Sequence, residues 1–513
     1  MGGGPIITGS VQDASFAPPR PKEKVLLTGE FNRIIILNAW ICLFLITAST
    51  NGYDGTMMNG LQSLPQWQSA FKHPSNGMLG LLNAIQHIGS LAAFPFVAWL
   101  SDGIGRRKAV FLGATIMLAA TAVQTASQSV HMFIAARFLI GFGLTFATNA
   151  APLLITELAY PEHRAQLTSL YNSVWCLGSI SAAWATYGAL SIKNTWSWRL
   201  PTLLQGAPAI LQVALVLFAP ESPRWLVSKG KEVEALWVLA YYHADSNEQD
   251  PLIQYEFEEI KAAVDFDRTV VANVGWKSLI ATPGNRKRMR IIVALAFFSQ
   301  WSGNSLILNY LNKVFNRIGI TNPRTQLLVN GLLQVWNLFW AVLAAFLVNR
   351  LGRRFLFLTS AGLMALFYTA QTICFAQYAE HGVPAAGYTF VVFVFLFFAG
   401  YCIGFAPLVV SYTVEILPFH LRSKGYNVFN LVVSLALIFN QYANPSALAA
   451  LGWKYDLVYV CWLAVEFVFL WFFVVETKNR TLEETAAIFD GEDALEKIVH
   501  QGVMRDLSGT FVR

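Results

Sequence analysis

The chain has 513 residues, of which 55% are hydrophobic, 14% aromatic and only 13% charged. An average soluble domain carries about 25% charged residues, so this composition excludes an ordinary soluble globular protein. The formal net charge of +6 raises the alternative of a nucleic-acid partner, but the positions of the basic residues, described below, argue against one.

The N-terminal segment, residues 1–30, contains Gly, Pro and polar residues without helical periodicity, and we expect a flexible tail there. Beyond it, apolar runs of about 20 residues, the length that crosses a bilayer, recur along the whole chain. These runs lie roughly at 31–54, 78–100, 109–127, 131–155, 168–190, 200–219, 291–315, 325–348, 355–376, 388–415, 425–447 and 456–475. The sequence therefore predicts an all-α membrane protein with about twelve transmembrane helices.

A charged stretch divides these runs into two sets of six, and it contains two segments with helical character, at 231–242 and 252–264. We expect short surface helices in this stretch. In chain order, the predicted organisation comprises an N-terminal tail (1–30), a six-helix bundle (31–219), a cytoplasmic helical linker (220–290), a second six-helix bundle (291–476) and a C-terminal tail (477–513).

The basic residues gather in the N-terminal tail and in loops that lie on one side of the bilayer if the chain has these twelve spans. They are Arg20, Lys22, Lys24, Arg33, Arg106, Arg107, Lys108, Arg286, Lys287, Arg288, Arg290, Arg350, Arg353, Arg354, Arg422 and Lys424. By the positive-inside rule this side, with both termini, faces the cytoplasm. The positive charge is explained by topology, so we expect contact with a lipid bilayer and no nucleic-acid partner.

The first run contains an aspartate between glycines, in Asn51-Gly52-Tyr53-Asp54-Gly55. An ionisable side chain inside a span costs about 2.5–3.5 kcal/mol or more, so it needs a partner or a watery cavity. Arg137 is a candidate partner, since 62 − 54 equals 137 − 129 if the spans meet the surface at Gln62 and Ser129. Both charges then lie about 12 Å below one surface. We interpret them as a buried, breakable pair; the alternative is a static salt bridge that only fixes helix packing.

The two halves of the sequence repeat each other. Asp102-Gly103-Ile104-Gly105-Arg106-Arg107 follows the second span, and Asn349-Arg350-Leu351-Gly352-Arg353-Arg354 follows the eighth. Glu157, Pro161 and Arg164 end the fourth span as Glu415, Pro418 and Arg422 end the tenth, and Pro220-Glu221-Ser222 corresponds to Val475-Glu476-Thr477. Two parallel six-span repeats are typical of transporters that bind their substrate between two moving halves.

These motifs together resemble the sugar porter family of the major facilitator superfamily. The resemblance rests on the two Gly-Arg-Arg loops, the Glu-x-x-x-Pro-x-x-Arg pattern, PESPRWL at 220–226, QWSGNS at 300–305 and VETKNRTLEE at 475–484, and it covers nearly the whole chain. QWSGNSLILNYLNKV at 300–314, SYTVEILPFHLRSKG at 411–425 and FNQYANP at 439–445 resemble the fungal lactose permease and cellodextrin transporter branch. The resemblance implies the major facilitator fold.

The charged residues at the ends of the spans imply, by this resemblance, a cytoplasmic gate. Opposite charges there are expected to bridge the two halves while the substrate site faces outward, and to separate when it opens inward. The predicted gate residues are Arg106, Glu157 and Arg164 in the first half and Arg353, Glu415 and Arg422 in the second. The alternative is that the arginines serve only as topology signals.

A sugar site needs amides and hydroxyls for paired hydrogen bonds, and intramembrane amides are conspicuous in this chain. The candidate binding residues are Asn172, Gln300, Asn304, Ser305, Tyr310, Asn337 and Asn430. By resemblance, Gln300 and Asn337 match sugar-binding amides, whereas Asn172 stands where relatives commonly have glutamine and Ser305 where they commonly have asparagine. The alternative for each is interhelical packing.

Two valines depart from the family pattern. Val410 occupies the place of a tryptophan that stacks on sugar in hexose and xylose porters, and Val433 that of a polar ligand. A larger pocket compatible with a disaccharide is expected. His87 and Glu466, also intramembrane, are interpreted as packing or lumen residues.

Proton coupling follows from the resemblance at Asp54, because proton-driven sugar porters tend to have an aspartate there and uniporters an uncharged residue. The hypothesis is that protonation breaks the pair with Arg137 and lets the first span close over bound sugar. Gln205 occupies the place of a second carboxylate found in some bacterial symporters, so one proton site is predicted.

The expected protein is therefore a proton-coupled symporter of a disaccharide or hexose in the plasma membrane. We expect a monomer with no cofactor and no metal, and no enzymatic activity, since G-x-S-x-G, P-loop and metal-spaced His/Cys motifs are absent from the sequence. A facilitative uniporter on the same fold is the nearest alternative. A sugar sensor that hardly transports is a second alternative, although such sensors usually carry a long C-terminal extension.

Overall fold

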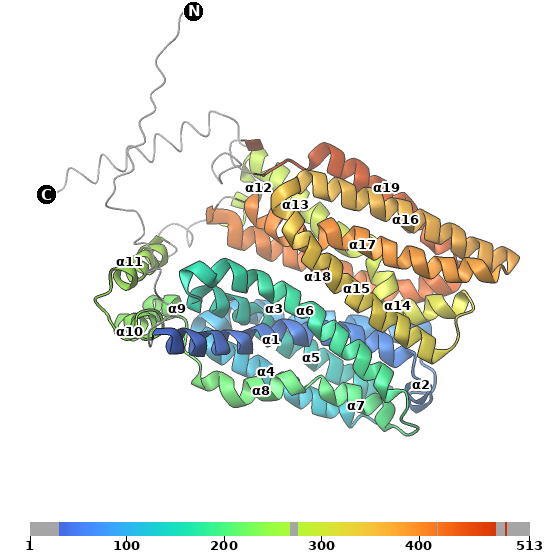
Figure 1. Cartoon of the computed structure of the whole chain (residues 1–513), viewed down its shortest axis with the longest axis horizontal. Coiled ribbons are helices and arrows are strands. Elements are labelled where there is room, and N and C mark those ends of the chain that lie inside the picture. Colours follow the sequence, from blue (N-terminus) through green and yellow to red (C-terminus); the bar gives the residue numbers. More distant parts are fainter. Residues whose placement is uncertain (1–29, 267–274, 418, 479–487, 490–513) are drawn as a thin grey trace, which may run out of the picture.

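The computed structural model describes residues 30–266, 275–417, 419–478 and 488–489. These residues form nineteen α-helices and one 3-10 turn, and the described segments contain no strand. The long helices form two bundles that lie side by side (Figure 1). This arrangement confirms the prediction of an all-α protein built from two sets of helices.

The N-terminal half begins at α1 and ends at the 3-10 turn. Serine side chains cap two of its helices: the Oγ atoms of Ser75 and Ser129 accept hydrogen bonds from the backbone N–H of Met78 and Met132, which would otherwise lack partners. The elements are α1 (Glu30–Gln62), α2 (Pro65–Ala70), α3 (Asn76–Ile104), α4 (Arg106–Thr125), α5 (Val130–Leu158), α6 (Pro161–Ala189), α7 (Trp196–Leu204), α8 (Ala207–Leu215) and η1 (Val216–Phe218).

Four short helices connect the halves: α9 (Pro223–Ser228), α10 (Glu232–His243), α11 (Pro251–Phe266) and α12 (Ser278–Ala281). The ring of His243 joins α10 to α11 and to the end of α5, since Nδ1 lies 2.9 Å from Glu256 Oε2 and Nε2 lies 3.1 Å from the carbonyl oxygen of Leu158. An ion pair between Arg33 of α1 and Asp245, which follows α10, joins these two segments as well (2.9 Å). The helices α10 and α11 therefore pack on the N-terminal half.

The C-terminal half contains the remaining seven helices. They are α13 (Pro283–Trp301), α14 (Asn304–Arg317), α15 (Pro323–Leu351), α16 (Arg353–His381), α17 (Pro384–Glu415), α18 (Phe419–Leu451) and α19 (Lys454–Phe473). A large apolar core fills this half, with many fully buried aromatic side chains, among them Tyr368, Phe357 and Phe375. Such rings contribute extensive van der Waals packing between the helices of this half.

Ten helices or broken helices of the described chain are long and apolar enough to cross a membrane. The two other long helices, α6 and α18, have 29 and 33 residues and coincide with the predicted fifth and eleventh spans. Each of the twelve predicted runs therefore coincides with a helix or with a broken helix. The chain is a multi-pass membrane protein.

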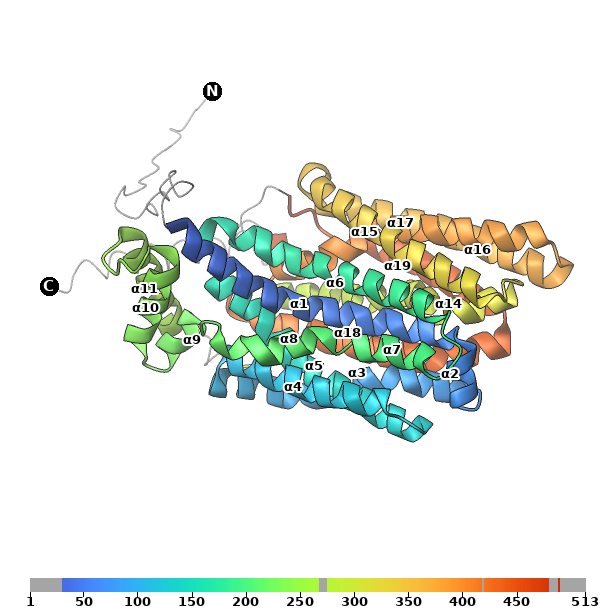
Figure 2. The same cartoon turned by 60° about the horizontal axis from the view of Figure 1, so that its bottom comes forward.

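The two ends of the bundle differ in charge and in connections. Figures 1 and 2 both show α9, α10 and α11 at one end and α2 at the other. We call the first the basic end, because the loops at Gly105 and Gly352 that precede Arg106 and Arg353 lie there, and the second the far end. The halves contact each other chiefly through α3 against α18 and α6 against α15.

Candidate functional site

The predicted charge pair is in contact. Asp54 lies within α1 and Arg137 within α5; Arg137 Nη1 is 3.3 Å from Asp54 Oδ1, and Nη2 is 3.5 Å from Oδ2. The side chains are 0% and 2% exposed. In this closed environment the attraction between the charges is stronger than at a wet surface, and the cost of removing both from water is higher as well.

Each member of this pair has a second partner. The Nε of Arg137 donates to the carbonyl oxygen of Leu82 at 2.7 Å, and its Nη2 donates to Gln86 Oε1 at 2.8 Å. Gln205 Nε2 donates to Asp54 Oδ1 at 2.5 Å. If the ion pair parts, Arg137 keeps two acceptors in α3, so its separation does not leave an unsatisfied buried cation.

Two of these partners were not assigned to the pair from the sequence. From the sequence, Gln205 is an intramembrane amide in the place of a second carboxylate, and no role is predicted for Gln86. Gln205 sits at the junction of α7 and α8, where the helix is interrupted, and it is fully buried. The sequence feature that could have indicated this contact is an amide inside a predicted span, because a polar side chain there requires a hydrogen-bond partner.

The helix α1 approaches α6 very closely beside the pair. A Cβ at Gly52 would lie 2.0 Å from the carbonyl oxygen of Trp175, and one at Gly178 would lie 1.8 Å from that of Ser49. Small residues at such crossings let backbones pack in membranes. Gly55, one residue beyond Asp54, faces open space instead, with nothing within 4 Å. The glycines around Asp54 therefore fix α1 against α6 while leaving room on another side.

The seventh predicted span is broken. The helix α13 ends at Trp301, Gly303 adopts a positive φ of +91°, and α14 begins at Asn304. A Cβ at Gly303 would lie 2.3 Å from the Tyr368 ring, so both conformation and space require glycine. The break stands among three of the predicted sugar-binding residues, Gln300, Asn304 and Ser305.

Amide side chains satisfy backbone groups that this break releases. Asn304 Nδ2 donates to the carbonyl oxygen of Ser299 at 3.0 Å, and Asn440 Nδ2 donates to that of Gln300 at 2.7 Å. Glu466, buried in α19, accepts from Ser302 Oγ at 2.9 and 3.2 Å. Asn304 and Glu466 therefore hold the break in place, as the packing interpretation of Glu466 predicts.

The other predicted sugar-binding residues lie on separate helices. Asn337, in α15, is buried, and its Oδ1 has no hydrogen-bond partner among the described residues. Asn430, in α18, is half-buried, and Val410, in α17, is 37% exposed. The side chain of Asn172 lies outside the described part. The structure thus groups Gln300, Asn304 and Ser305 at one break, and their role in sugar binding stays a prediction.

Tyr310 takes part in a contact between the halves. Its hydroxyl accepts from Asn83 Nδ2 at 2.9 Å and donates to the carbonyl oxygen of Gln441 at 2.6 Å, and its side chain is fully buried. The side chain of Gln441 in turn lies 3.1 Å from the His87 ring. The predicted sugar ligand Tyr310 is therefore occupied by the N-terminal half in this conformation, and His87 lies at the interface between the halves.

Further hydrogen bonds join the halves at the far end. Asn59 Nδ2 donates to Asn330 Oδ1 at 3.2 Å, and Gln62 Nε2 donates to the carbonyl oxygen of Asn309 at 3.2 Å. Gly80 extends this contact, since a Cβ there would lie 2.7 Å from the carbonyl oxygen of Tyr442. Side chains and backbones of both halves are thus in direct contact at the far end, which is closed.

The predicted gate residues at the basic end pair within each half. Arg106 Nε lies 3.7 Å from Glu157 Oε2, and Arg353 binds Glu415 through two nitrogens at 3.1 and 3.3 Å. A hydroxyl completes each pair, from Ser222 to Glu157 and from Thr477 to Glu415. Arg422 is half-buried in the first turn of α18, and the side chain of Arg164 lies outside the described residues.

This differs from the expected bridge between the halves. The ion pairs seen for Arg106 and Arg353 lie within one half, because each joins the start of one helix to the end of the next: α4 to α5, and α16 to α17. In this conformation they stabilise the basic end of each half separately. Their role as a gate stays a prediction.

A second carboxylate of each repeat caps a helix at the basic end. Glu476 Oε1 and Oε2 accept from the backbone N–H of Arg353 (2.9 Å) and Arg354 (3.0 Å), at the start of α16. Glu221 Oε1 accepts from the N–H of Arg107 at 3.1 Å, at the start of α4. A carboxylate at a helix N-terminus binds free N–H groups and interacts favourably with the helix dipole.

We expect Glu476→Gln to lower the free energy of unfolding by about 1–3 kcal/mol, because a neutral amide accepts these hydrogen bonds less strongly. Thermal unfolding in detergent checks this. The control is Glu234→Gln, whose exposed pair with Lys231 (2.9 Å) contributes about 0–1 kcal/mol at most. Equal effects of the two changes would contradict the assignment of Glu476 as a helix cap.

Comparison with known proteins identifies the family. The family described as "Sugar (and other) transporter" matches residues 40–489. The chain belongs to this family. Its fold and family are those of transporters of the major facilitator superfamily, as the motifs predicted.

The relatives of the chain come from plants, bacteria and fungi. It is 29% identical over 470 residues to the probable polyol transporter 6 of Arabidopsis thaliana, with 86% of this chain and 92% of the relative covered. It is 27% identical over 405 residues to the arabinose-proton symporter of Escherichia coli K12, with 77% and 82% covered. This spread leaves the fungal lactose and cellodextrin branch a prediction.

The fold agrees with that of a solved transporter. The inward open conformation of the xylose transporter XylE from E. coli matches with a TM-score of 0.72 at 23% identity, over 88% of this chain and 100% of that one. The likeness concerns the fold alone.

Proposed function

We propose that the chain is a proton-coupled symporter that imports a disaccharide, or a hexose, across the plasma membrane by alternating access, with the basic end and both termini in the cytoplasm. The observation that carries the proposal is the buried pair of Asp54 and Arg137, in which each partner keeps a further hydrogen bond. A carboxylate that accepts a proton on separation can drive transport without leaving its arginine unsatisfied.

The proposed cycle uses two contacts described above. A proton from the far side neutralises Asp54, which frees α1 from Arg137. Sugar binds near the break between α13 and α14, and the far end closes through Tyr310 and its partners. Opening of the basic end then releases the proton and the sugar. The names of the arabinose-proton symporter and of the proton:xylose symporter XylE among similar proteins support a proton-coupled mechanism for this chain.

The proposed sugar site lies around Gln300 and Asn337. The unpartnered Oδ1 of Asn337 and the half-buried amide of Gln300 supply acceptor and donor groups that paired sugar hydroxyls need. A disaccharide is compatible with Val410, because the smaller side chain leaves room that a tryptophan would fill. The motifs at 300–314, 411–425 and 439–445 support the fungal lactose and cellodextrin branch.

Uptake of a panel of labelled mono- and disaccharides in a transporter-free cell tests the proposal. We expect accumulation of one disaccharide class, abolished by a protonophore. Uptake that is saturable but indifferent to the protonophore would establish a uniporter, and binding without uptake would indicate a sensor. Either result would overturn the proposed coupling.

We expect Gln300→Ala to raise the KM for the transported sugar by about 10- to 100-fold, since a lost hydrogen bond to a buried hydroxyl costs about 1–3 kcal/mol. Initial uptake rates over a range of sugar concentrations measure this. Ser434→Ala is the control, because its Oγ donates to its own helix at the carbonyl of Asn430 (2.9 Å). An unchanged KM in Gln300→Ala would remove this residue from the site.

A further inference from the structure

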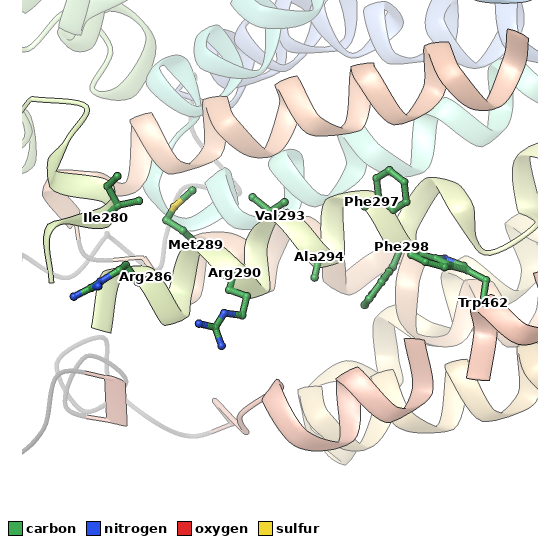
Figure 3. A pocket seen from close by; sticks show the side chains of 9 residues that line it. All are labelled: Ile280, Arg286, Met289, Arg290, Val293, Ala294, Phe297, Phe298 and Trp462. Carbon is green, nitrogen blue, oxygen red and sulfur yellow. The ribbon is translucent and has the colours of Figure 1, made fainter. Parts of the chain in front are cut away.

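An apolar groove runs along the outside of the C-terminal half, between α13 and α19. It has a volume of about 560 Å³, within the range of sites that hold small ligands. Figure 3 shows its side chains along α13, with Trp462 of α19 at one end. The groove is lined by Ile280, Arg286, Met289, Arg290, Val293, Ala294, Phe297, Phe298 and Trp462. It lies apart from the proposed sugar site and is not explained by sugar transport.

The lining of α13 changes character along the helix axis. Arg286 and Arg290 are one turn apart and exposed, and Val293 and Phe297 continue the same stripe at spacings of three and four residues. The stripe from Arg286 to Phe297 spans 297 − 286 residues, about 16 Å at 1.5 Å each, close to half of a hydrocarbon core of about 30 Å. With the two arginines at the membrane surface, the apolar side chains of the stripe therefore extend through about the thickness of one leaflet.

The groove continues beyond Trp462. A second hollow of about 440 Å³ is lined by Leu457, Val458, Cys461, Trp462 and Val465 of α19. The two hollows share Trp462. Together they offer an extended, apolar path along α19 that starts at the two arginines.

The two arginines have no acidic partner in the described part of the chain. Arg286 Nε lies 3.5 Å from the carbonyl oxygen of Thr282 in its own helix, and the guanidinium of Arg290 stands 5.8 Å from the Phe473 ring. No carboxylate is among the lining residues. The two acidic residues of α19 are buried beside other partners, Glu466 against Ser302 and Asp456 against Tyr368. The positive charge at the mouth of the groove is therefore uncompensated by the protein that the structure describes.

We propose that this groove binds an anionic phospholipid of the leaflet at the basic end. The phosphate and the further negative charge of the headgroup bind Arg286 and Arg290, and one acyl chain lies in the hollow along Val293, Phe297 and Trp462. Basic pockets between transmembrane helices on the cytoplasmic side are suited to anionic headgroups, because planar guanidinium groups bind phosphate oxygens in pairs. The apolar walls match a lipid chain, which a free phosphate ion lacks.

Native mass spectrometry of the full chain tests this lipid site. The protein is released from bilayers of phosphatidylserine and phosphatidylcholine with identical acyl chains, and the retained lipids are counted. We expect the wild type to retain phosphatidylserine preferentially. The double change Arg286→Gln with Arg290→Gln should weaken that retention by about 30-fold, from about 1 kcal/mol per basic residue.

Two further variants make the test specific. Lys287→Gln removes an equal charge from the same turn of α13 but not from the groove, so it should retain the lipid as the wild type does. Ala294→Trp leaves both arginines and fills the hollow, so it should lose phosphatidylserine. The circular dichroism melt of each variant establishes that it is folded.

Five results would overturn the proposal. Four concern the lipid. Equal loss in Lys287→Gln would indicate only a general surface charge. The others are unchanged retention in the double arginine variant, unchanged retention in folded Ala294→Trp, and equal retention of the two lipids by the wild type. A wild-type dimer in mild detergent that Ala294→Trp converts to a monomer would assign the groove to a second copy of the chain, and would also overturn it.

Discussion

Asp54→Asn is expected to abolish accumulation of sugar against a gradient while leaving exchange of sugar at equilibrium. The amide cannot bind and release a proton, so the membrane potential no longer drives the cycle. A potential of 100 mV contributes about 2.3 kcal/mol per charge, enough for about 50-fold accumulation. We therefore expect the internal-to-external ratio of labelled sugar to fall from values of this order to one.

Two measurements separate loss of coupling from loss of folding. Counterflow of labelled sugar without any gradient should persist in Asp54→Asn, because the amide oxygen can still accept from Gln205 and Arg137. Asp245→Asn, which removes a carboxylate from the surface pair with Arg33 (2.9 Å), should accumulate sugar normally. Energised accumulation in folded Asp54→Asn would contradict the coupling mechanism.

Gly80→Val is expected to block the transport cycle by keeping the far end open. A Cβ at this position would lie 2.7 Å from the carbonyl oxygen and 3.2 Å from the Cα of Tyr442, across the interface of α3 and α18. The backbone of Tyr442 cannot move aside as a flexible side chain could. Overpacking of this kind destabilises the closed state by about 1–3 kcal/mol or more. Net uptake should therefore fall by about 10- to 100-fold.

The defect of Gly80→Val should be conformational, not a failure to fold. Closure at this point is needed only in one of the two transport states, so the variant should still bind sugar from the far side. Gly77→Val is the matched control, one turn earlier on α3, where a Cβ meets nothing within 4 Å. Normal uptake by Gly80→Val, or equal loss in both variants, would contradict the assignment of this contact to closure.

The sequence predicted the fold well, for reasons that are local to each span. Apolar runs of about 20 residues cross a bilayer as helices, because their backbone groups must pair within the segment. The pair of Asp54 and Arg137 was also predictable, since charge is costly inside a membrane and equal depths from one surface brought the two together. The amide partners of this pair, Gln86 and Gln205, were not predictable, because the position of an amide in the sequence does not indicate which neighbouring helix it contacts.

The sequence was less informative where the role of a residue depends on the conformation of the protein. Tyr310 was predicted to bind sugar, and in the structure its hydroxyl joins the halves through Asn83 and Gln441. A tyrosine in a span has the same pattern in either role. The apolar run at 291–315 did not reveal the break at Gly303, because a glycine between polar residues is compatible with an intact transmembrane helix.

The burial of Asp54 has a consequence for energy conservation. With the carboxylate 0% exposed and its oxygens occupied by Arg137 and Gln205, Asp54 is not accessible to solvent in this conformation. If Asp54 is the proton site proposed above, a hydrogen ion can bind or leave only after the helices around it move. A carrier resting in this state should conduct no leak current, so the ion gradient is not dissipated when sugar is scarce.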